Sequence, residues 1–364
     1  MPWHNALAVV STRLRGAGYG IKGVGEHGVF TLGYYTMLGA KRVLVTGAGG
    51  FIGSHLVEEL ARHGAIVRAM VHYNSASSRG ALSFIDPAIE RSLDVAAGNI
   101  EDGDFVFRAV QGMDIVLHLA ALIAIPYSYV APRSYVRTNV EGTLNVLEAA
   151  RRIGVARVVH TSTSEVYGTA LREPIDEDHP LQGQSPYSAS KIGADKIAES
   201  YFRSFGTPVV TLRPFNTFGP RQSARAFIPT IISQALERDE IELGSLEPQR
   251  DMTFVVDTVD GFIRAAVTPG IDGETINLGT GETYNVREFA ERILRLMGID
   301  KPIRVDPNRV RPRRSEVLKL VSDNSKARRL LDWQPHTSID DGLNRTVEFI
   351  KRHRGLYRPS VYAL

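Results

Sequence analysis

Lys41-Arg42-Val43-Leu44-Val45-Thr46-Gly47-Ala48-Gly49-Gly50-Phe51-Ile52-Gly53 is the stretch that decides the fold of this chain. Its apolar first half predicts a strand, and apolar residues at helical spacing predict a helix over residues 51–63. In such a unit Gly47 permits a tight turn, Gly50 lets the backbone approach a pyrophosphate, and Gly53 lets helix and strand pack closely. Because a helix N-terminus attracts phosphate, the stretch predicts a dinucleotide-binding site.

Outward from this stretch, apolar runs of strand length alternate with segments of helical periodicity. Strands joined by helices of this length predict an α/β fold, a Rossmann-type doubly wound parallel sheet. Beyond residue 213 proline and glycine become frequent and the elements shorten, which predicts a smaller C-terminal α/β substrate-binding lobe. The predicted strands are residues 66–71, 95–98, 114–118, 158–162, 209–213, 241–243 and 254–256, and the predicted helices are 138–153, 188–205, 286–297 and 324–331.

The domain boundaries follow from these patterns. We expect a dinucleotide-binding domain over residues 41–215 that also receives segments near 252–278, a substrate-binding lobe mainly over 216–350, and a tail over 351–364. The glycine-rich, acid-poor residues 1–40 are expected to be a disordered extension, or upstream sequence ahead of a start at Met37. A transit peptide is the less favoured interpretation.

Composition excludes several classes of protein. The 364 residues include 43 Lys and Arg and 40 Asp and Glu, and a net charge of +3 does not argue for nucleic-acid binding. The absence of cysteine excludes a disulfide framework, a Cys-ligated metal site and a thiol nucleophile, and it fits a reducing cytoplasm. Because no apolar run reaches about 18 residues, we expect no membrane span. We also expect no metal site.

The end of the second predicted strand bears on the choice of cofactor. An acid there would bind the adenosine ribose of NAD, but the sequence is His72-Tyr73-Asn74-Ser75. The missing acid leaves room for the 2′-phosphate of NADP beside Arg79, so both cofactors stay open. Asn99 could bind the adenine or lie on the surface, and Gly49 could serve as a turn residue with positive φ.

A second group of polar residues predicts catalysis. Thr163 and Glu165 follow a predicted strand, and Tyr187 and Lys191 are four residues apart in a predicted helix, so they share a face. A lysine ammonium near a phenol favours the phenolate, and we therefore expect Lys191 to lower the pKa of Tyr187 toward that of a general base.

Together these residues resemble the extended short-chain dehydrogenase/reductase family of nucleotide-sugar epimerases and dehydratases. The resemblance covers residues 41–350, and three segments (122–128, 162–169 and 180–187) are most similar to 4,6-dehydratases of the legionaminic acid pathway. These dehydratases act on nucleotide-linked N-acetylglucosamine. The motifs that carry the family resemblance are Thr46 to Gly53, His118-Leu119-Ala120-Ala121, Asn139 with Gly142-Thr143, Tyr187 to Lys191, Arg213 to Gln222, and Asp323 to Ala327.

The resemblance implies roles for individual residues. Tyr187 takes the proton of the sugar O4, Lys191 holds the nicotinamide ribose, and Thr163 contacts O4, with Ser164 and Glu165 completing the catalytic set. The implied substrate contacts are Ser128, Asn216, Arg250 and Arg311. The cofactor contacts are Gly47, Gly50, Phe51, Ile52, Gly53, His72, Asn74, Ser75, Asn99, Ile100, Leu119, Ala120, Ala121, Asn139, Tyr187, Lys191 and Pro214.

One departure from the family pattern leaves the reaction open. The well-known 4,6-dehydratases carry adjacent Asp and Glu, whereas this chain has Ser164-Glu165, as hexuronate decarboxylases do. We expect a dehydratase acting on UDP- or GDP-N-acetylglucosamine, with an epimerase or UDP-glucuronate decarboxylase as the alternative and a non-catalytic NAD(P)-sensing protein as a remote one. The resemblance also implies a homodimer and a cofactor that stays bound through each turnover.

Overall fold

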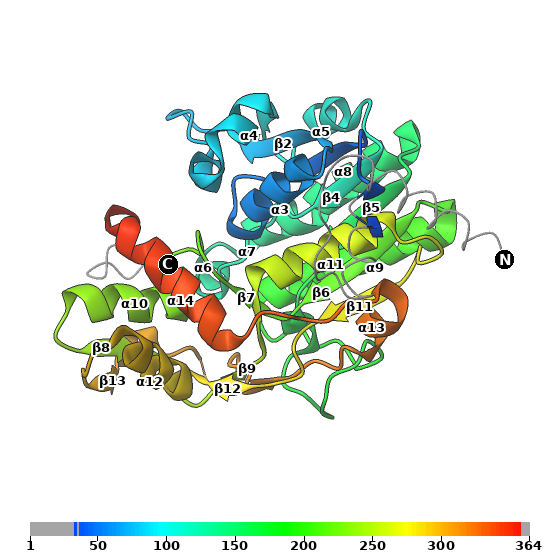
Figure 1. Ribbon diagram of the computed structural model, residues 1–364. Coiled ribbons are helices and arrows are strands. Elements are labelled where there is room, and N and C mark those ends of the chain that lie inside the picture. Colours follow the sequence, from blue (N-terminus) through cyan, green and yellow to red (C-terminus); the bar gives the residue numbers. More distant parts are fainter. Residues whose placement is uncertain (1–32, 35, 313, 358–364) are drawn as a thin grey trace.

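The computed structural model describes residues 33–34, 36–312 and 314–357 (Figure 1). We expected residues 1–40 to be a disordered extension. Residues 1–32 and 35 of this stretch lie outside the described part of the chain. Its last part is not an extension, however, because Leu38 is completely buried in the core. The backbone N–H of Ala40 also donates to the carbonyl of Gly64, 3.0 Å away. Packing of the fold therefore begins several residues before the first strand.

A seven-stranded parallel sheet forms the centre of the molecule, in the order β11-β6-β5-β4-β1-β2-β3. The chain winds from β1 outward to β3, then returns to β4 on the other side of β1, which places a topological switch point between β1 and β4. This confirms the doubly wound prediction. The strands are β1 (Arg42–Thr46), β2 (Ile66–His72), β3 (Asp94–Gly98), β4 (Ile115–His118), β5 (Arg157–Thr161), β6 (Val209–Pro214) and β11 (Thr275–Leu278).

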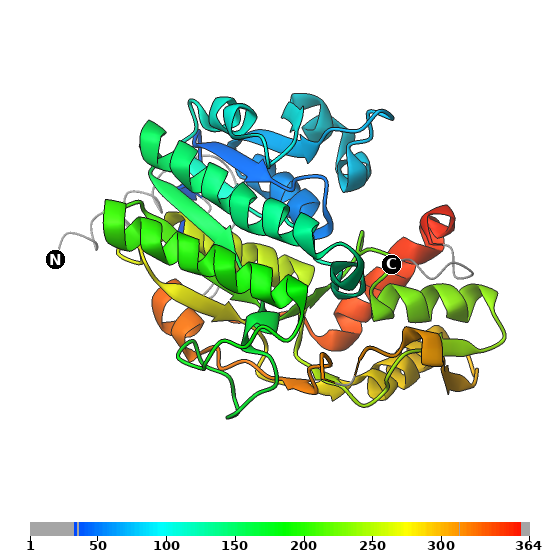
Figure 2. The same cartoon turned by 180° about the vertical axis from the view of Figure 1, so that it is seen from behind.

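Helices cover both faces of the sheet. α3 (Phe51–Arg62) and α11 (Val255–Val267) pack together on one face, and α5 (Gly103–Val110), α8 (Gly142–Ile153) and α9 (Pro186–Phe205) pack side by side on the other (Figures 1 and 2). Successive side chains of β1 point to opposite faces of the sheet, so both faces are apolar and need a covering layer of helices. Val43 and Val45 belong to one hydrophobic core, and Leu44 between them belongs to another.

Most predicted elements agree with the structure within two residues, and the disagreements have local causes. Residues 254–256 were expected to be a strand, but β10 (Met252–Phe254) ends there and α11 starts at Val255. A short apolar run fits a buried strand or a helix start equally well. α9 begins two residues early because Ser185 forms a capping box with Ser188 and proline occupies the first helical position.

The remaining elements gather beside the carboxyl ends of the strands (Figure 1). α10 (Phe227–Glu237) packs against α12 (Val286–Met297) and α14 (Ile339–Arg352), and buried Ile231, Phe289 and Ile293 belong to the same hydrophobic core. Short sheets complete this region: β8 (Ile241–Leu243) pairs with β13 (Ile303–Val305), β7 (Asn216–Phe218) with β10, and β9 (Gln249–Arg250) lies between β12 (Tyr284–Asn285) and β14 (Lys319–Leu320). α13 (Ser325–Leu331) covers β11.

The end of the chain packs more closely than the predicted tail implied. α14 continues to Arg352, and Tyr357 beyond it is buried, with its hydroxyl donating to the carbonyl of Gln222 at 3.0 Å. Residues 358–364 of the predicted tail lie outside the described part.

Candidate active site

A cavity of about 800 Å³ runs along the carboxyl ends of the sheet strands, between the glycine-rich turn and the C-terminal elements. This is where parallel α/β sheets bind ligands. The sequence-predicted residues that line it are Gly47, Gly50, Phe51, Ile52, Gly53, His72, Asn74, Leu119, Ala120, Ala121, Thr163, Glu165, Tyr187, Lys191, Pro214, Asn216, Arg250 and Arg311. The cavity therefore joins the predicted cofactor, catalytic and substrate residues in one space.

The glycine-rich turn has the geometry of a phosphate cradle. Gly47 has φ of +69°, and a Cβ at Gly53 would lie 2.2 Å from the carbonyl oxygen of Gly47. The first N–H groups of α3 have no partner within that helix and face this turn. Gly49 does not have positive φ; it is needed because a Cβ there would lie 2.8 Å from the carbonyl oxygen of Arg79. The residues present thus fit the pyrophosphate of a dinucleotide.

The loop after β2 lines the cavity beside the glycine-rich turn, where we expected the cofactor ribose. Asn74, predicted to contact the cofactor, accepts a hydrogen bond from the N–H of Ser78 at 2.9 Å and donates to its carbonyl at 2.8 Å, so its side chain folds the loop. Ser75 does not line the cavity, whereas Ser78, Arg79 and Gly80 do. Gly80 has φ of +62° and packs on Gly49. An Asn followed by a serine- and glycine-containing loop was the signal for this turn.

Three further predicted cofactor residues are not part of the cavity lining. Asn99 is exposed and accepts a hydrogen bond from the N–H of Glu101, and Ile100 is buried beneath Gly142. Asn139 is also buried: its side chain accepts from the N–H of Leu122 at 2.8 Å and donates to the carbonyl of Leu122 at 3.0 Å. Asn139 therefore holds the loop that forms the cavity wall.

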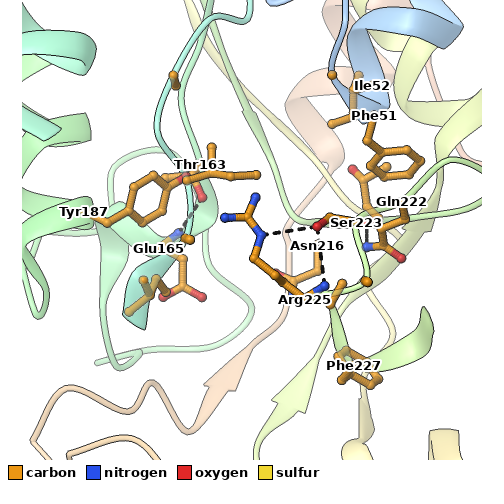
Figure 3. A pocket seen from close by; sticks show the side chains of 18 of the residues that line it. Phe51, Ile52, Thr163, Glu165, Tyr187, Asn216, Gln222, Ser223, Arg225 and Phe227 are labelled. Carbon is orange, nitrogen blue, oxygen red and sulfur yellow. Dashed lines mark hydrogen bonds between the residues drawn. The ribbon is translucent and has the colours of Figure 1, made fainter. Parts of the chain in front are cut away.

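The predicted catalytic tyrosine and threonine meet at the carboxyl end of β5. Tyr187 is buried, and its ring packs edge-on against Tyr135 at a centroid distance of 6.2 Å. Burial raises the pKa of Tyr187, although a hydrogen bond with Thr163 opposes this. Figure 3 shows the Tyr187 ring and Thr163 next to one another, with Glu165 below them.

The net shift of the Tyr187 pKa is opposite to the lowering that we expected from Lys191. The pKa of Tyr187 is raised, and the Lys191 ammonium donates to the carbonyl of Thr161 at 2.5 Å. Burial also lowers the pKa of Lys191 to about 8, opposed by the carboxylate of Asp195. Burial therefore outweighs the pairing that sequence spacing suggested.

Asp195, one helical turn beyond Lys191, binds side chains at the carboxyl ends of β5 and β6. Its carboxylate accepts hydrogen bonds from the Ser162 hydroxyl at 2.7 Å and from Arg213 at 3.2 Å, and it pairs with His160 at 3.0 Å. Although burial opposes its charge, the hydrogen bond from His160 and the Arg213 charge hold the pKa of Asp195 below its usual range. The network fixes Ser162, the residue before Thr163.

Glu165 and Ser164 have different surroundings. Glu165 is half-buried and lines the cavity, and its N–H donates to the Thr163 hydroxyl at 3.2 Å. Ser164 is buried outside the cavity lining, and its hydroxyl has no hydrogen-bond partner among the described residues. The structure thus brings one residue of the predicted pair to the site and not the other.

The substrate end of the cavity contains residues that sequence reasoning missed. Ser128 was predicted there but is fully buried, donating to the carbonyl of Ile125 at 2.6 Å. Arg225 and Phe227 do line the cavity, and Figure 3 shows Arg225 extending toward the space between Glu165 and Ser223. Arg225 Nε donates to the Ser223 hydroxyl at 3.2 Å. Arg225 lies two residues before α10, in a loop whose sequence carries no motif for a binding site.

Known proteins match nearly the whole fold. The chain matches the family described as GDP-mannose 4,6 dehydratase over residues 44–346. UDP-glucose 4-epimerase of Mycolicibacterium smegmatis is 34% identical over 316 residues, covering 85% of this chain and 98% of that protein. UDP-glucuronic acid decarboxylase 1 of Xenopus tropicalis is 30% identical over 326 residues, covering 86% and 72%. A structure of DesIV, a dTDP-glucose 4,6-dehydratase from Streptomyces venezuelae with NAD and TYD bound, has a TM-score of 0.80 at 33% identity, covering 87% and 99%.

The chain therefore belongs to the extended short-chain dehydrogenases/reductases, in the NAD-dependent epimerase/dehydratase family that acts on nucleotide sugars. This confirms the family resemblance and the fold. The relatives include dehydratases, epimerases and decarboxylases at similar identities, so the narrower likeness to the legionaminic acid pathway stays a prediction.

Within residues 33–34, 36–312 and 314–357, no helix has the length and apolarity of a membrane span. The same ranges contain no group of three or more histidine and acidic side chains placed to hold a metal ion.

Proposed function

We propose that the protein is a nucleotide-sugar 4,6-dehydratase that converts UDP- or GDP-N-acetylglucosamine to its 4-keto-6-deoxy product. The observation that carries the proposal is one continuous cavity that joins a dinucleotide cradle at Gly47 to Thr163, Glu165 and Tyr187, and then to Arg250. The segments resembling legionaminic acid pathway dehydratases favour the N-acetylglucosamine substrate and a cytoplasmic reaction.

A nicotinamide cofactor, NAD or NADP, would supply reversible acceptance of hydride from C4 of the sugar when bound. Tyr187 takes the O4 proton while Thr163 orients O4, and Lys191 holds the nicotinamide ribose. Because burial raises the pKa of free Tyr187, we propose that the phenol becomes a base only when the site is filled. After water has left, the hydride would return to C6 and a proton from solvent would restore C5, so the cofactor would stay bound through the cycle.

Glu165 is the proposed acid–base residue of the elimination step. Oxidation at C4 acidifies the C5 proton, because the carbanion formed is an enolate of the ketone. Glu165 then takes the C5 proton and delivers it to the departing C6 hydroxyl. Its position in the cavity beside Thr163 supports this role.

Ser164 favours a second candidate function. A dehydratase with two acids would use a carboxylate where this chain has a serine, and Ser164 is buried away from the cavity. One carboxylate suits a 4-epimerase or a UDP-glucuronate decarboxylase, both of which begin with oxidation at C4. These reactions differ from dehydration only after the ketone has formed.

The test is product mass. Purified protein is incubated with UDP- and GDP-linked N-acetylglucosamine, glucose and glucuronate, and products are analysed by mass spectrometry. Loss of water from an N-acetylglucosamine nucleotide supports the proposal. Loss of carbon dioxide identifies a decarboxylase, and an isomer of unchanged mass identifies an epimerase. No turnover of any sugar nucleotide favours a non-catalytic NAD(P)-sensing protein.

We propose a homodimer formed through α8 and α9. Leu144 and Phe205 are apolar residues of these helices with 38% and 57% of their surface exposed. A two-fold contact could bury both sets of side chains. Light scattering at micromolar concentration should report twice the chain mass, and Leu144→Glu should dissociate the dimer. A wild-type monomer would refute the assembly.

A further inference from the structure

A second cavity, of about 530 Å³, lies beside α9 and shares no lining residue with the cavity of the candidate active site. Its walls come from the segment before α9, from one side of α9, from β6, from the start of the edge strand β11 and from Lys326 of α13. None of the proposed catalytic steps uses this cavity. A space of this size can hold a small organic molecule.

The β6 side of the second cavity presents a hydroxyl without a partner. Val209, Thr211 and Arg213 alternate along β6, so their side chains share the face of the sheet that lies toward α9. Thr211 is 7% exposed, and its hydroxyl makes no hydrogen bond within residues 33–34, 36–312 and 314–357. A buried hydroxyl normally has a partner, because leaving it unpaired costs free energy. Thr211 therefore offers a hydrogen bond to a molecule in this cavity.

The charges around the second cavity are unequally paired, because each lysine and arginine of its lining forms an ion pair with an acid of the same lining. The pairs, at 2.7–3.2 Å, are Lys196 and Arg203 with Glu199, Arg213 with Asp195, and Lys326 with Glu274. Glu177 and Asp178 also line the cavity but form no ion pair with any residue that the structure describes. The unpaired charge is therefore negative, which favours a cationic ligand over an anionic one.

Glu177 is held in a fixed position near Thr211. Its Oε1 accepts a hydrogen bond from the backbone N–H of Asn277 at 2.7 Å, and Asn277 of β11 is in register with Arg213, two residues from Thr211 on β6. Burial raises the pKa of Glu177, although the Asn277 N–H and the Lys326 charge oppose this. A cation in the cavity would thus meet a half-buried carboxylate that has no ion-pair partner of its own.

The same lining favours an organic cation over a metal ion. Across the described ranges, no three histidine or acidic side chains are grouped to hold a metal. Ala198, Phe202 and Val209 instead add apolar surface to the walls, against which a short hydrocarbon chain could pack.

We propose that the second cavity binds a small aliphatic amine, whose ammonium group is held by Glu177 and the Thr211 hydroxyl. Its hydrocarbon chain packs against Ala198, Phe202 and Val209. Because the two cavities share no lining residue, the amine binds whether or not the candidate active site is occupied.

The test measures binding to the full-length protein by calorimetry, with butylammonium as the probe. Butyrate and butanol have the same chain length but a negative charge and no charge, and we expect neither to bind. Glu177→Gln keeps an oxygen that can accept from Asn277 but removes the charge, so it should raise the dissociation constant of butylammonium by roughly tenfold. Thr211→Val removes the hydroxyl at nearly constant volume and should raise it by about threefold.

Glu237→Gln is the matched control, because Glu237 is an exposed carboxylate at the end of α10 outside both cavity linings. Saturable binding of butylammonium alone, weakened in Glu177→Gln and unchanged in Glu237→Gln, supports the proposal. Equal binding of butyrate, unchanged affinity in Glu177→Gln, or no saturable binding at millimolar concentration overturns it. Thermal unfolding shows whether each variant is folded. If Glu177→Gln is not, unchanged affinity in Thr211→Val overturns the proposal instead.

Discussion

The two ends of the cavity are built in different ways. At the predicted cofactor end the groups expected to bind the ligand are backbone N–H groups, arranged by Gly47 and Gly53 within a few consecutive residues. At the substrate end they are side chains of Arg225 and Arg250, which come from a separate loop and strand. The first end depends on local conformation, and the second on tertiary packing. A substitution at the first end should therefore abolish binding altogether, whereas a substitution at the second end should change binding or rate only in part.

The largest expected effect is at the cofactor end. Gly53→Ala places a Cβ 2.2 Å from the carbonyl oxygen of Gly47, a contact that backbone must move to relieve. We expect the purified variant to lose its bound dinucleotide and several kcal/mol of stability. The measurement is cofactor released by denaturation, together with the midpoint of thermal unfolding.

The control for this change is Gly355→Ala, where an added Cβ would have no atom within 4 Å and φ is not positive. That variant should behave as wild type. If Gly53→Ala keeps a full complement of cofactor, the turn is not the rigid cradle described here.

The second effect falls where the two ends meet, at Glu165. Glu165→Gln should keep cofactor and still oxidise C4, seen as a transient absorbance of reduced nicotinamide. Dehydration should nevertheless slow by roughly two to four decades, the range for loss of a general acid–base group. Stopped-flow absorbance and product mass measure the two steps separately.

Glu101→Gln is a suitable comparison for Glu165→Gln, because Glu101 accepts a hydrogen bond from Thr138 away from the cavity lining. A Glu165→Gln enzyme that dehydrates at nearly the wild-type rate assigns the base to another group.

The two ends also differ in how well they could be predicted from the sequence. The strand–turn–helix unit is local, so Gly47 and Gly53 could be assigned their conformations before the structure was known. Asn74 lines the cavity as expected, but the sequence did not show that its side-chain amide also closes a turn on Ser78. Arg225 lies in a loop without periodic pattern, so nothing in the sequence showed that it reaches the cavity.

Energetics were harder to predict than positions. The spacing of Tyr187 and Lys191 correctly placed both at the cavity, yet the pKa of Tyr187 is raised because it is buried against Tyr135. Spacing along a helix reports which side chains are neighbours. It does not report how far neighbouring elements exclude water, and that exclusion controls the charge.

A third effect tests whether the cofactor end also contains a side-chain contact. Arg79 lines the cavity beside the loop that lacks an acid, 47% exposed and 3.6 Å from Glu90. We expect Arg79→Ala to weaken binding of NADP by about tenfold and that of NAD by no more than about twofold, because only NADP carries the 2′-phosphate. Fluorescence titration of cofactor-free protein measures both. Equal loss for the two cofactors would show that Arg79 supports only the loop.

The smallest effect concerns the contact between the two ends. His55 on α3 lies with its Nε2 2.9 Å from the carbonyl of Pro220, in the segment that leads to the substrate side. Burial, with a contribution from the Arg221 charge, lowers the pKa of His55 from 6.5 to about 4. Between these values the unfolded chain binds more protons than the folded one, so the free energy of unfolding rises with pH and falls on acidification.

His55→Gln should flatten this dependence, because glutamine can still donate to Pro220 but does not titrate. We expect the loss of stability from pH 7 to pH 5 to be smaller in the variant by about 1–2 kcal/mol. The buried His118 and His160 also have lowered pKa values, so both proteins should lose stability on acidification and only the difference reports His55. Urea denaturation at the two pH values measures it. Parallel losses in both proteins would mean that His55 protonates in the folded state as readily as in the unfolded chain.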